Sequence, residues 1–366
     1  MNSTVNSFKG RIALSLGILV VAFSAAVVLR TQAASDYKHP INGWQVMPPV
    51  SYKNLTLFPV RANDEGPTDA YITLDEGIKS GTVIITEKGS PGIIRRPLER
   101  GANPSARQST INQAQVQSIG QDGAVNRLVL INKSGKKLLL LAGEVIVGGK
   151  QDRIVEKDMI VPPYSDPIDI NVFCVEHGRW QRKTESFASL GAISHPKLRA
   201  AAQDRKDQSA VWSEVGKKNA ELGTANRTDT YQEVYRSKSV DDRMQPYIDA
   251  LQRELPGKGI VGVVVAKNGE PVWADLFASS SLFSRYWPKL LKSYVVDAVT
   301  DYPREIRPSL DQAERFLRER EGRTSFEGQE GVYRLTKIDH PQYAIFELED
   351  VSLMKPLRLH FNKMRR

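Results

Sequence analysis

The sequence from Leu138 to Trp180 reads LLLLAGEVIVGGKQDRIVEKDMIVPPYSDPIDINVFCVEHGRW and decides the fold. Apolar runs, several of them rich in β-branched residues, alternate here with turn-forming residues, which is typical of consecutive β-strands. We expect strands at Lys137–Ala142, Ile154–Val161 and Ile168–Val175. Lys137–Ala142 should also pair back on a strand at Val125–Ile131 as a hairpin. Residues 115–180 should therefore form an antiparallel, sandwich-like β region.

The chain before this stretch predicts two strands around one short helix. Leu55–Val60 and Thr82–Thr86 have the composition of strands. Thr73 and Glu76 have the spacing of a capping box, so a helix should begin there and end at Gly81.

After residue 180 the apolar residues change to helical spacing. Pro196–Leu222 should be one helix, and a second should begin at Ser239 and end before Pro256. Asn268 and Gly269 predict the two-residue turn of a β-hairpin. The remaining elements are expected to be helices at Leu282–Ala298 and Ser309–Arg320 and strands near 331–338, 343–349 and 353–361.

This order of elements predicts an α+β fold. An antiparallel, sandwich-like β region is followed by helices and by a smaller mixed α/β C-terminal part. We divide the chain into a signal peptide or membrane anchor (1–34), a linker (35–50), an α+β domain (51–300; β-rich to 180, helical over 181–256, hairpin and helix over 257–300) and a C-terminal helix with strands (301–366).

The composition is that of a globular protein with an excess of basic residues. The 366 residues carry a net charge of +9, but 42 acidic residues are interspersed among 51 basic ones. Neither a nucleic-acid-binding motif nor a basic run with stacking aromatics is present, so we expect no nucleic-acid partner. The single cysteine, Cys174, excludes a disulfide within one chain, and its place on the apolar face of a strand predicts a buried, inert thiol.

The N-terminus has the pattern of a targeting segment. Lys9 and Arg11 precede the uncharged apolar run Ile12–Leu29, which a further basic residue follows. The run is longer than a typical cleaved signal and at the lower limit of a membrane span. We therefore expect an extracytoplasmic protein, periplasmic or secreted, that is either cleaved from this segment or anchored by it.

Two glycine motifs resemble nucleotide-binding loops but have the wrong context. Gly257–Gly262 spells GxGxxG, yet it follows a predicted helix and opens a strand, the reverse of a dinucleotide site. Gly148–Gln151 lacks the first glycine and the final Ser or Thr of a phosphate-binding loop. The five histidines are dispersed along the chain. We therefore expect no cofactor and no metal.

Within the central stretch, polar residues follow the ends of two predicted strands. If these strands are neighbours, the side chains could converge, and paired carboxylates with an arginine and an imidazole could act as acid and base or hold an anion. A buried salt-bridge network is the structural alternative. The candidate catalytic residues are Glu144 and Glu176, and the candidate binding residues are Gln151, Arg153, His177, Arg179 and Trp180.

Four runs of the sequence resemble one protein family. They are Tyr71–Gly77 (YITLDEG), Ala142–Arg153 (AGEVIVGGKQDR), Cys174–Trp180 (CVEHGRW) and Asp275–Phe277 (DLF). They are similar to the ARG and rhodanese-phosphatase-superfamily-associated protein domain, in which ARG stands for ADP-ribosylglycohydrolase. The similarity covers about residues 50–300, and this chain has His177 where the family more often has glutamine. The family name implies a nucleotide-derived or phosphorylated ligand.

Two functions from different classes fit these observations. The first is an exported or membrane-anchored binding module for an anionic or phosphorylated small molecule, or for a protein. The second is a hydrolase that uses Glu144 and Glu176 on a phosphorylated or glycosidic substrate.

Overall fold

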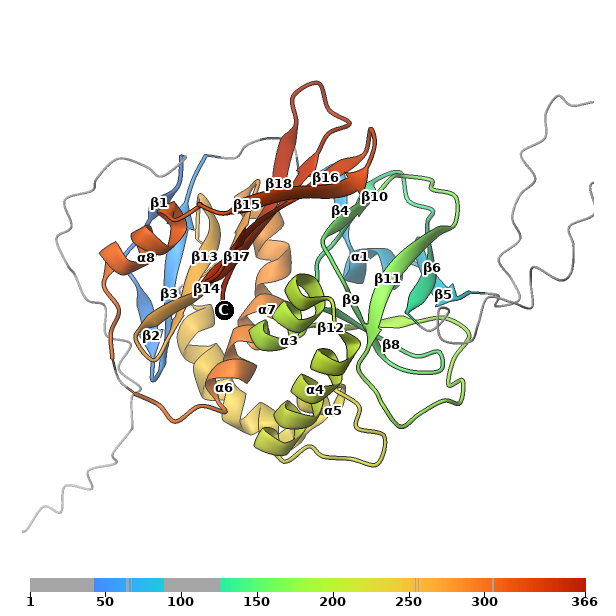
Figure 1. Cartoon of the computed structure of the whole chain (residues 1–366), viewed down its shortest axis with the longest axis horizontal. Helices are drawn as coiled ribbons and strands as arrows, with labels where there is room; N and C mark the ends of the chain where they lie inside the picture. The colour runs from blue at the N-terminus through green and yellow to red at the C-terminus, as the bar shows by residue number, and fades with distance from the viewer. Residues whose placement is uncertain are drawn as a thin grey trace, which may run out of the picture.

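The computed structural model describes residues 43–63, 66, 68–88, 126–253, 255, 257–304 and 306–366. The N-terminal run Ile12–Leu29, on which the expectation of export rests, lies outside these residues. Within them, no helix has both the length and the apolar character needed to cross a membrane. The fold is α+β, as the sequence predicts (Figure 1).

In the described part of the chain the strands form three sheets. The largest has nine strands in the order β1 (Gln45–Val46), β3 (Leu55–Arg61), β13 (Ile260–Lys267), β14 (Glu270–Phe277), β18 (Leu357–Arg365), β17 (Tyr343–Asp350), β16 (Tyr333–His340) and β15 (Arg323–Gln329), with β2 (Val50–Tyr52) also on β3. The second has the order β12 (Ala188–Ile193), β8 (Glu144–Val147), β9 (Arg153–Val155), β11 (Ile168–Cys174), β6 (Arg127–Asn132) and β5 (Val83–Glu87). The third has the order β10 (Met159–Val161), β7 (Lys137–Leu140) and β4 (Tyr71–Thr73).

Four of the helices in the described residues begin at a residue whose side chain caps the first turn. They are α1 (Leu74–Lys79), α3 (Pro196–Ala200), the π-helical turn η2 (Ala201–Arg205), α4 (Gln208–Leu222), α5 (Glu233–Arg236), α6 (Lys238–Gln252), α7 (Ser280–Ala298) and α8 (Leu310–Arg318). The predicted capping box of Thr73 and Glu76 is confirmed at the start of α1, and Ser309 with Gln312 forms another at the start of α8.

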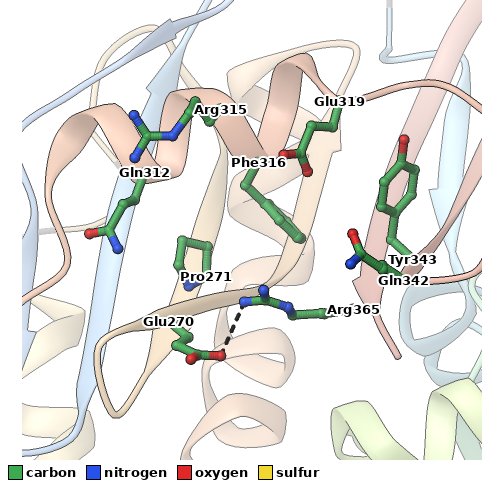
Figure 2. Close-up of a pocket in the computed structure, with 9 residues that line it drawn as sticks. All are labelled: Glu270, Pro271, Gln312, Arg315, Phe316, Glu319, Gln342, Tyr343 and Arg365. Carbon is green, nitrogen blue, oxygen red and sulfur yellow. Dashed lines mark hydrogen bonds and ion pairs between the residues drawn. The ribbon is translucent and has the colours of Figure 1, made fainter.

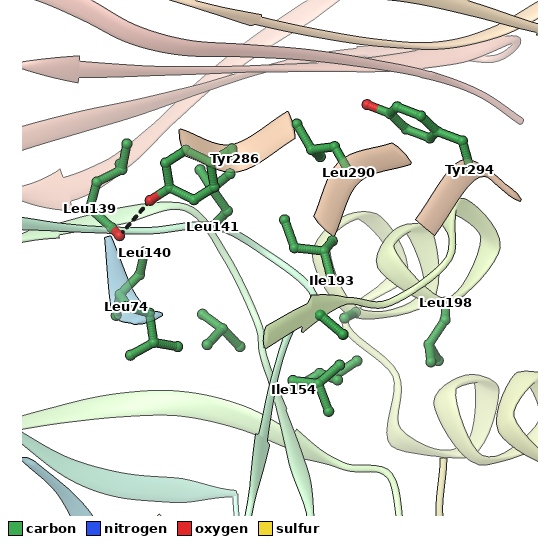
Figure 3. Close-up of a cluster of buried hydrophobic side chains, with 14 of the residues drawn as sticks. Leu74, Leu139, Leu140, Leu141, Ile154, Ile193, Leu198, Tyr286, Leu290 and Tyr294 are labelled. Atoms are coloured by element: carbon green, nitrogen blue, oxygen red, sulfur yellow. Dashed lines mark hydrogen bonds between the residues drawn. The ribbon is translucent and has the colours of Figure 1, made fainter. Parts of the chain in front are cut away.

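Helix α7 is the centre of the larger hydrophobic core. It packs against β13 and β14 of the large sheet and against β12 of the six-stranded sheet (Figure 1). Its side chains are buried around almost the whole helix, which explains its high aromatic and aliphatic content. Tyr286 donates its hydroxyl to the Leu139 carbonyl at 2.9 Å, so that even its polar atom is satisfied (Figure 3). The apolar side chains around it come from α1, α3, α7, β7, β9 and β12, and from Leu141 just after β7 (Figure 3).

A second, smaller core lies between α8 and the large sheet. Phe316 and Leu317 of α8 pack there with Phe58 of β3 and Phe361 of β18. Strands β3 and β13 of the large sheet are thus covered by apolar contacts on both faces, which explains their nearly continuous burial.

The predicted hairpin between Val125–Ile131 and Lys137–Ala142 is wrong. Strand β6 pairs with β11 and β5, whereas β7 pairs with β10 and, in parallel, with β4. The Asn132 side chain fixes this crossover, because its amide donates to the carbonyls of Lys136 at 2.8 Å and Pro162 at 2.9 Å. The turn therefore leads the chain from one sheet into another instead of reversing it within one.

Two long predicted elements are divided in the structure. The predicted strand Ile154–Val161 is β9 and β10, in different sheets, separated by a polar segment with the buried Asp158. The predicted helix Pro196–Leu222 is interrupted at Lys206, which has a left-handed φ of 52°. Asp207 then caps α4 by accepting the backbone N–H groups of its first turn at 2.7 and 3.0 Å.

The C-terminal region joins the large sheet. The Asn268–Gly269 hairpin is confirmed as the β13–β14 connection. The predicted strands after residue 330 correspond to β16, β17 and a later-starting β18, and β18 lies between β14 and β17. Strand β15 was not predicted, because RTSFEGQ has no apolar alternation.

Candidate functional site

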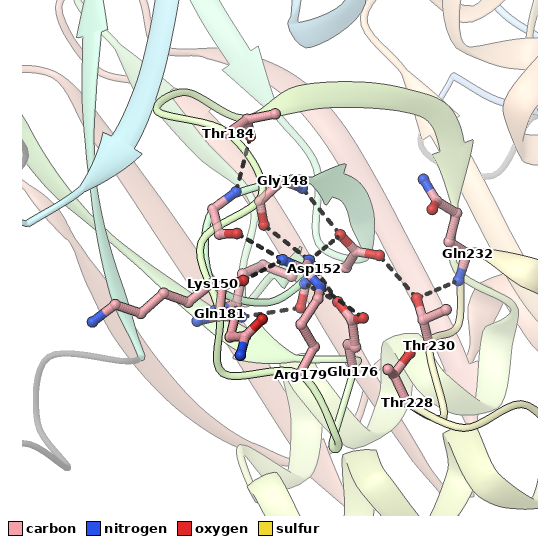
Figure 4. A network of polar contacts seen from close by, with 12 residues as sticks. Gly148, Lys150, Asp152, Glu176, Arg179, Gln181, Thr184, Thr228, Thr230 and Gln232 are labelled. Atoms are coloured by element: carbon pink, nitrogen blue, oxygen red, sulfur yellow. Dashed lines mark hydrogen bonds and ion pairs between the residues drawn. The ribbon is translucent and has the colours of Figure 1, made fainter.

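Two loops meet around the guanidinium of Arg179 (Figure 4). Its Nε donates to Glu176 Oε1 at 2.9 Å, and its Nη2 lies 2.7 Å from Glu176 Oε2. Nη1 donates to the Gly149 carbonyl at 2.7 Å, and Nη2 to the Gly148 carbonyl at 3.2 Å and Asp152 Oδ1 at 3.3 Å. The structure thus brings together the segment after β8 and the segment after β11. Because these acceptors occupy the donors of Arg179, the side chain holds the two loops to each other.

Electrostatics favour the charged form of this arginine. Burial alone would lower the pKa of Arg179, but its hydrogen bond and charge interaction with Glu176 raise it. Burial raises the pKa of the Asp152 carboxyl, opposed by the Gly148 N–H that donates to it at 3.0 Å and reinforced by the charge of Glu176. Asp152 also accepts the Thr230 hydroxyl at 2.8 Å, which fixes its second oxygen.

The turn after β8 needs glycine at its tip. Gly149 has a φ of 50°, and a Cβ there would lie 2.4 Å from Cζ of Phe187. Its N–H donates to the Thr184 hydroxyl at 3.1 Å, and the next N–H, of Lys150, donates to Glu87 Oε1 at 2.6 Å. The glycine at this position therefore permits a tight turn, and the turn is fixed by hydrogen bonds from both sides.

Gln151 and Arg153 lie behind this turn, out of contact with solvent. Gln151 is fully buried, and neither atom of its amide has a hydrogen-bond partner among the described residues. Arg153 is also buried, opposite Cys174 in the β9–β11 ladder, and its Nη1 donates to the Asp152 carbonyl at 3.2 Å. Burial lowers the pKa of the Arg153 guanidinium. Neither side chain is placed to meet a ligand at the surface.

His177 and Trp180 lie on the exposed side of the loop. The His177 ring packs edge-on against Trp212, with ring centroids 4.7 Å apart. Trp180 is 58% exposed. An exposed tryptophan next to a fixed arginine is a feature of interaction surfaces, where it offers a large contact area with little entropy to lose.

Glu144 lies at the other end of β8 from this loop pair. It is buried, it forms an ion pair with Lys289, and its second oxygen accepts the Leu141 N–H at 2.9 Å. Burial raises its pKa, although the charge of Lys289 opposes this. Because β8 separates Glu144 from the turn, roughly 10 Å or more of strand divides it from Glu176. The structure does not bring the two candidate catalytic carboxylates together.

The sequence did not predict a second group of charges, here called the interior network: Asp158, Arg199, Asp275, His360 and Asn362. All five are fully buried. Arg199 binds Asp275 through two hydrogen bonds of 2.9 and 3.0 Å. His360 lies between two carboxylates, with Nδ1 2.6 Å from Asp158 Oδ2 and Nε2 3.1 Å from Asp275 Oδ1. Asn362 donates to Asp275 at 2.9 Å.

These neighbours fix the charge state of the interior network. Burial alone would lower the pKa of His360, but Asp158 and then Asp275 raise it to about 9. Burial would raise the pKa of Asp275, but Arg199 and His360 hold it far below its usual range. One sequence signal was available, since Asp275 is an acidic residue inside the otherwise apolar strand PVWADLF.

Cys174 is buried, as the sequence predicts, and burial raises the pKa of its thiol. The thiol is therefore held in its unreactive, protonated form at neutral pH. In the described ranges, no three His, Cys, Asp or Glu side chains gather in a geometry that could hold a metal ion.

A family comparison covers most of the chain. The domain described as ARG and Rhodanese-Phosphatase-superfamily-associated Protein, ARPP-1, matches residues 43–345. The chain belongs to this family. Neither a curated protein nor a solved structure matches it. Both loops joined by Arg179 lie within the ARPP-1 match, whereas His360 on β18 lies beyond its end.

This ARPP-1 member also has a surface cavity of about 270 Å³ beside α8 (Figure 2). The cavity is lined by Glu270, Pro271, Gln312, Arg315, Phe316, Glu319, Gln342, Tyr343 and Arg365. Its arginines are already in ion pairs, Arg365 with Glu270 at 3.1 Å and Arg315 with Asp311. None of the predicted site residues lines it, so the candidate site is the loop pair held by Arg179.

Proposed function

We propose that this ARPP-1 protein is a binding module that presents the segment 177–183 to an anionic ligand. The observation that carries the proposal is the Arg179 contact set, which fixes this segment against the turn after β8 while leaving Trp180 exposed. The backbone supports the same arrangement: the Lys183 N–H donates to the Gly149 carbonyl at 2.8 Å. A surface fixed in advance loses little entropy on binding.

The charge of the exposed side chains indicates an anionic ligand. Lys150 and Lys183 are exposed on the two loops, and Arg182, also exposed, is paired with Glu87 at 3.6 Å and Glu185 at 3.1 Å. The family name implies a nucleotide-derived or phosphorylated ligand. Such a ligand carries negative charge, opposite to that of these side chains. Lysine and arginine attract such groups through charge, and the indole offers a face for stacking.

The alternative, a hydrolase with Glu144 and Glu176 as acid and base, has less support. Paired carboxylates in glycoside hydrolases lie roughly 5 to 9.5 Å apart on either side of the scissile bond. Glu144 is buried against Lys289, and Glu176 is bound to Arg179. Neither carboxylate faces the other across a space for substrate.

Export is part of the proposal. Its support is the basic start, Lys9 and Arg11, followed by the apolar run Ile12–Leu29. Fractionation of the native cells should find the protein outside the cytoplasm, either free or held by the membrane. A soluble cytoplasmic protein would contradict this part of the proposal.

Calorimetric titration tests the binding function. The purified protein is titrated with inorganic phosphate, a nucleoside diphosphate and a glutamate-rich peptide, at low and high salt. We expect at least one anion to bind, more weakly at high salt because the charges are exposed. Trp180→Ala and Lys183→Ala should each weaken binding about tenfold, which corresponds to about 1.4 kcal/mol. Tyr302→Ala, the loss of another exposed aromatic, is the control. No binding, or binding unchanged by Trp180→Ala, would refute the proposal.

A further inference from the structure

Strand β15 forms a long, exposed edge of the nine-stranded sheet. Among the described strands it pairs only with β16, so the other side of its backbone has no strand beside it. Six of its seven residues are exposed. The opposite edge is different, because it consists of the short strands β1 and β2, and α8 packs against β1. Of these two edges, only β15 can offer a full row of N–H and C=O groups.

The side chains of β15 do not protect this edge. It contains neither proline nor lysine, the residues that most often prevent edge pairing. Phe326 is 66% exposed on one face of the sheet, beside the Arg334 guanidinium at 5.8 Å. A large apolar side chain on an unpaired edge indicates a surface that another chain covers.

The charges of β15 would be complementary to those of a second copy of the same strand, paired with it in the antiparallel direction. Arg323 lies 3.6 Å from Asp339 of its own chain, yet its side chain stays 86% exposed. It lies four residues before Glu327, on the same face of the strand. In an antiparallel pair centred on Ser325, Arg323 of each copy would lie opposite Glu327 of the other. Glu327 binds Lys157 at 2.5 Å and Lys206 at 2.9 Å in its own chain, and its side chain stays 36% exposed.

We propose that two copies of this protein associate through β15, antiparallel and centred on Ser325, to form one continuous sheet. The two-fold axis passes between the two Ser325 residues, which makes the interface closed and limits the assembly to a dimer. On one face Arg323 pairs with the partner's Glu327, and on the other Thr324 lies against the partner's Phe326. Opposite charges and β-branched–aromatic pairs are both favourable cross-strand neighbours.

Cysteine cross-linking tests the register. Ser325→Cys places two thiols directly opposite each other, within the Cα separation that a disulfide spans in either kind of antiparallel pair. The native Cys174 is buried and does not interfere. Mild oxidation should give a covalent dimer with Ser325→Cys and a monomer with the control Ser281→Cys, which is also exposed.

A charge reversal tests the pairing without relying on the cysteine. Light scattering should give twice the 40.9 kDa chain mass for the unaltered protein. Arg323→Glu would place two glutamates opposite each other at each end of the paired strands. It should raise the dissociation constant of the dimer by about tenfold or more. Arg304→Glu, the same change at another exposed site, should not. A monomer at all concentrations up to millimolar, or a dimer that neither cross-links as Ser325→Cys nor responds to Arg323→Glu, would overturn the proposal.

Discussion

Arg199 and Asp275 form a two-point ion pair in the core, with Nη1–Oδ2 and Nη2–Oδ1 separations of 2.9 and 3.0 Å. Arg199 belongs to α3 and Asp275 to β14, so the pair joins the helical region to the large sheet. The Trp273 indole also donates to Asp275, at 2.9 Å. A buried charge with this many partners makes a region sensitive to the loss of any one of them.

Arg199→Met should destabilise the protein by roughly 3–5 kcal/mol, because it leaves the buried Asp275 carboxylate without its main countercharge. Urea unfolding at neutral pH measures the change. Arg318→Met is the matched control, since Arg318 forms an exposed ion pair with Glu314 on α8. It should cost less than about 1 kcal/mol. Equal effects of the two changes would show that the Arg199–Asp275 pair contributes no more to stability than an exposed ion pair does.

Stability should fall as the pH rises above neutrality, because of His360. Its folded-state pKa, about 9, exceeds the ordinary value of 6.5, so folding favours the protonated ring. That contribution is complete below pH 6.5 and is lost as the pH approaches about 9. Between pH 6.5 and 8 the free energy of unfolding should drop by about 2 kcal/mol.

The upper limit of that interval is set by Lys363. Burial lowers the pKa of Lys363 to about 8, so its own contribution to stability changes in the opposite direction at higher pH. Urea unfolding at several pH values within the interval should therefore show the decline in the unaltered protein and not in His360→Gln. An NMR titration that finds the His360 ring neutral at pH 7.5 would contradict the prediction independently of that variant's fold.

Arg179→Lys should destabilise the loop pair even though it keeps the charge. A lysine ammonium cannot reproduce the fork that reaches Glu176 and the carbonyls of Gly148 and Gly149. With the Arg179 side chain only 16% exposed, the loss should be roughly 1–3 kcal/mol. Arg182→Lys, a neighbouring exposed arginine, should stay within about 0.5 kcal/mol. Thermal unfolding compares the two, and indistinguishable melting temperatures would refute the anchoring role of Arg179.

Local signals in the sequence predicted local structure. The Thr73–Glu76 capping box and the Asn268–Gly269 turn each involve residues at most three positions apart, and both are confirmed. Of the polar candidates in the central stretch, Glu176 and Arg179 meet, whereas Glu144 lies at the other end of β8. Arg179 and Gly149 meet because β8 and β11, the strands before them, lie in one sheet, although the sequence did not predict β8 as a strand.

Pairings between distant segments could not be predicted. His360 and Asp158 are 202 residues apart, and each sits in a segment whose pattern fits several positions in a sheet. Strand β15 has almost no apolar residues, because one of its faces meets charged side chains and the other meets solvent. Glu144 and Glu176 each follow the end of a predicted strand, and this alone suggested that they are close. The sequence does not show whether those two strand ends lie at the same edge of a sheet.

The close approach of β13 and β14 gives the last prediction. Gly262, the final glycine of the GxGxxG motif, faces the backbone of β14: a Cβ there would lie 2.2 Å from the Asp275 carbonyl oxygen and 2.7 Å from Leu276 Cα. Backbone atoms cannot move aside as a flexible side chain can, so Gly262→Ala should cost about 2–3 kcal/mol or more. Gly257→Ala, in the same motif, would meet only Ile260 Cγ1 at 3.5 Å and should change stability by less than about 0.5 kcal/mol. Urea unfolding separates the two variants. If Gly262→Ala left stability unchanged but removed binding of a nucleoside diphosphate, the glycine would be making room for a ligand, and the rejection of the motif as a nucleotide site would be wrong.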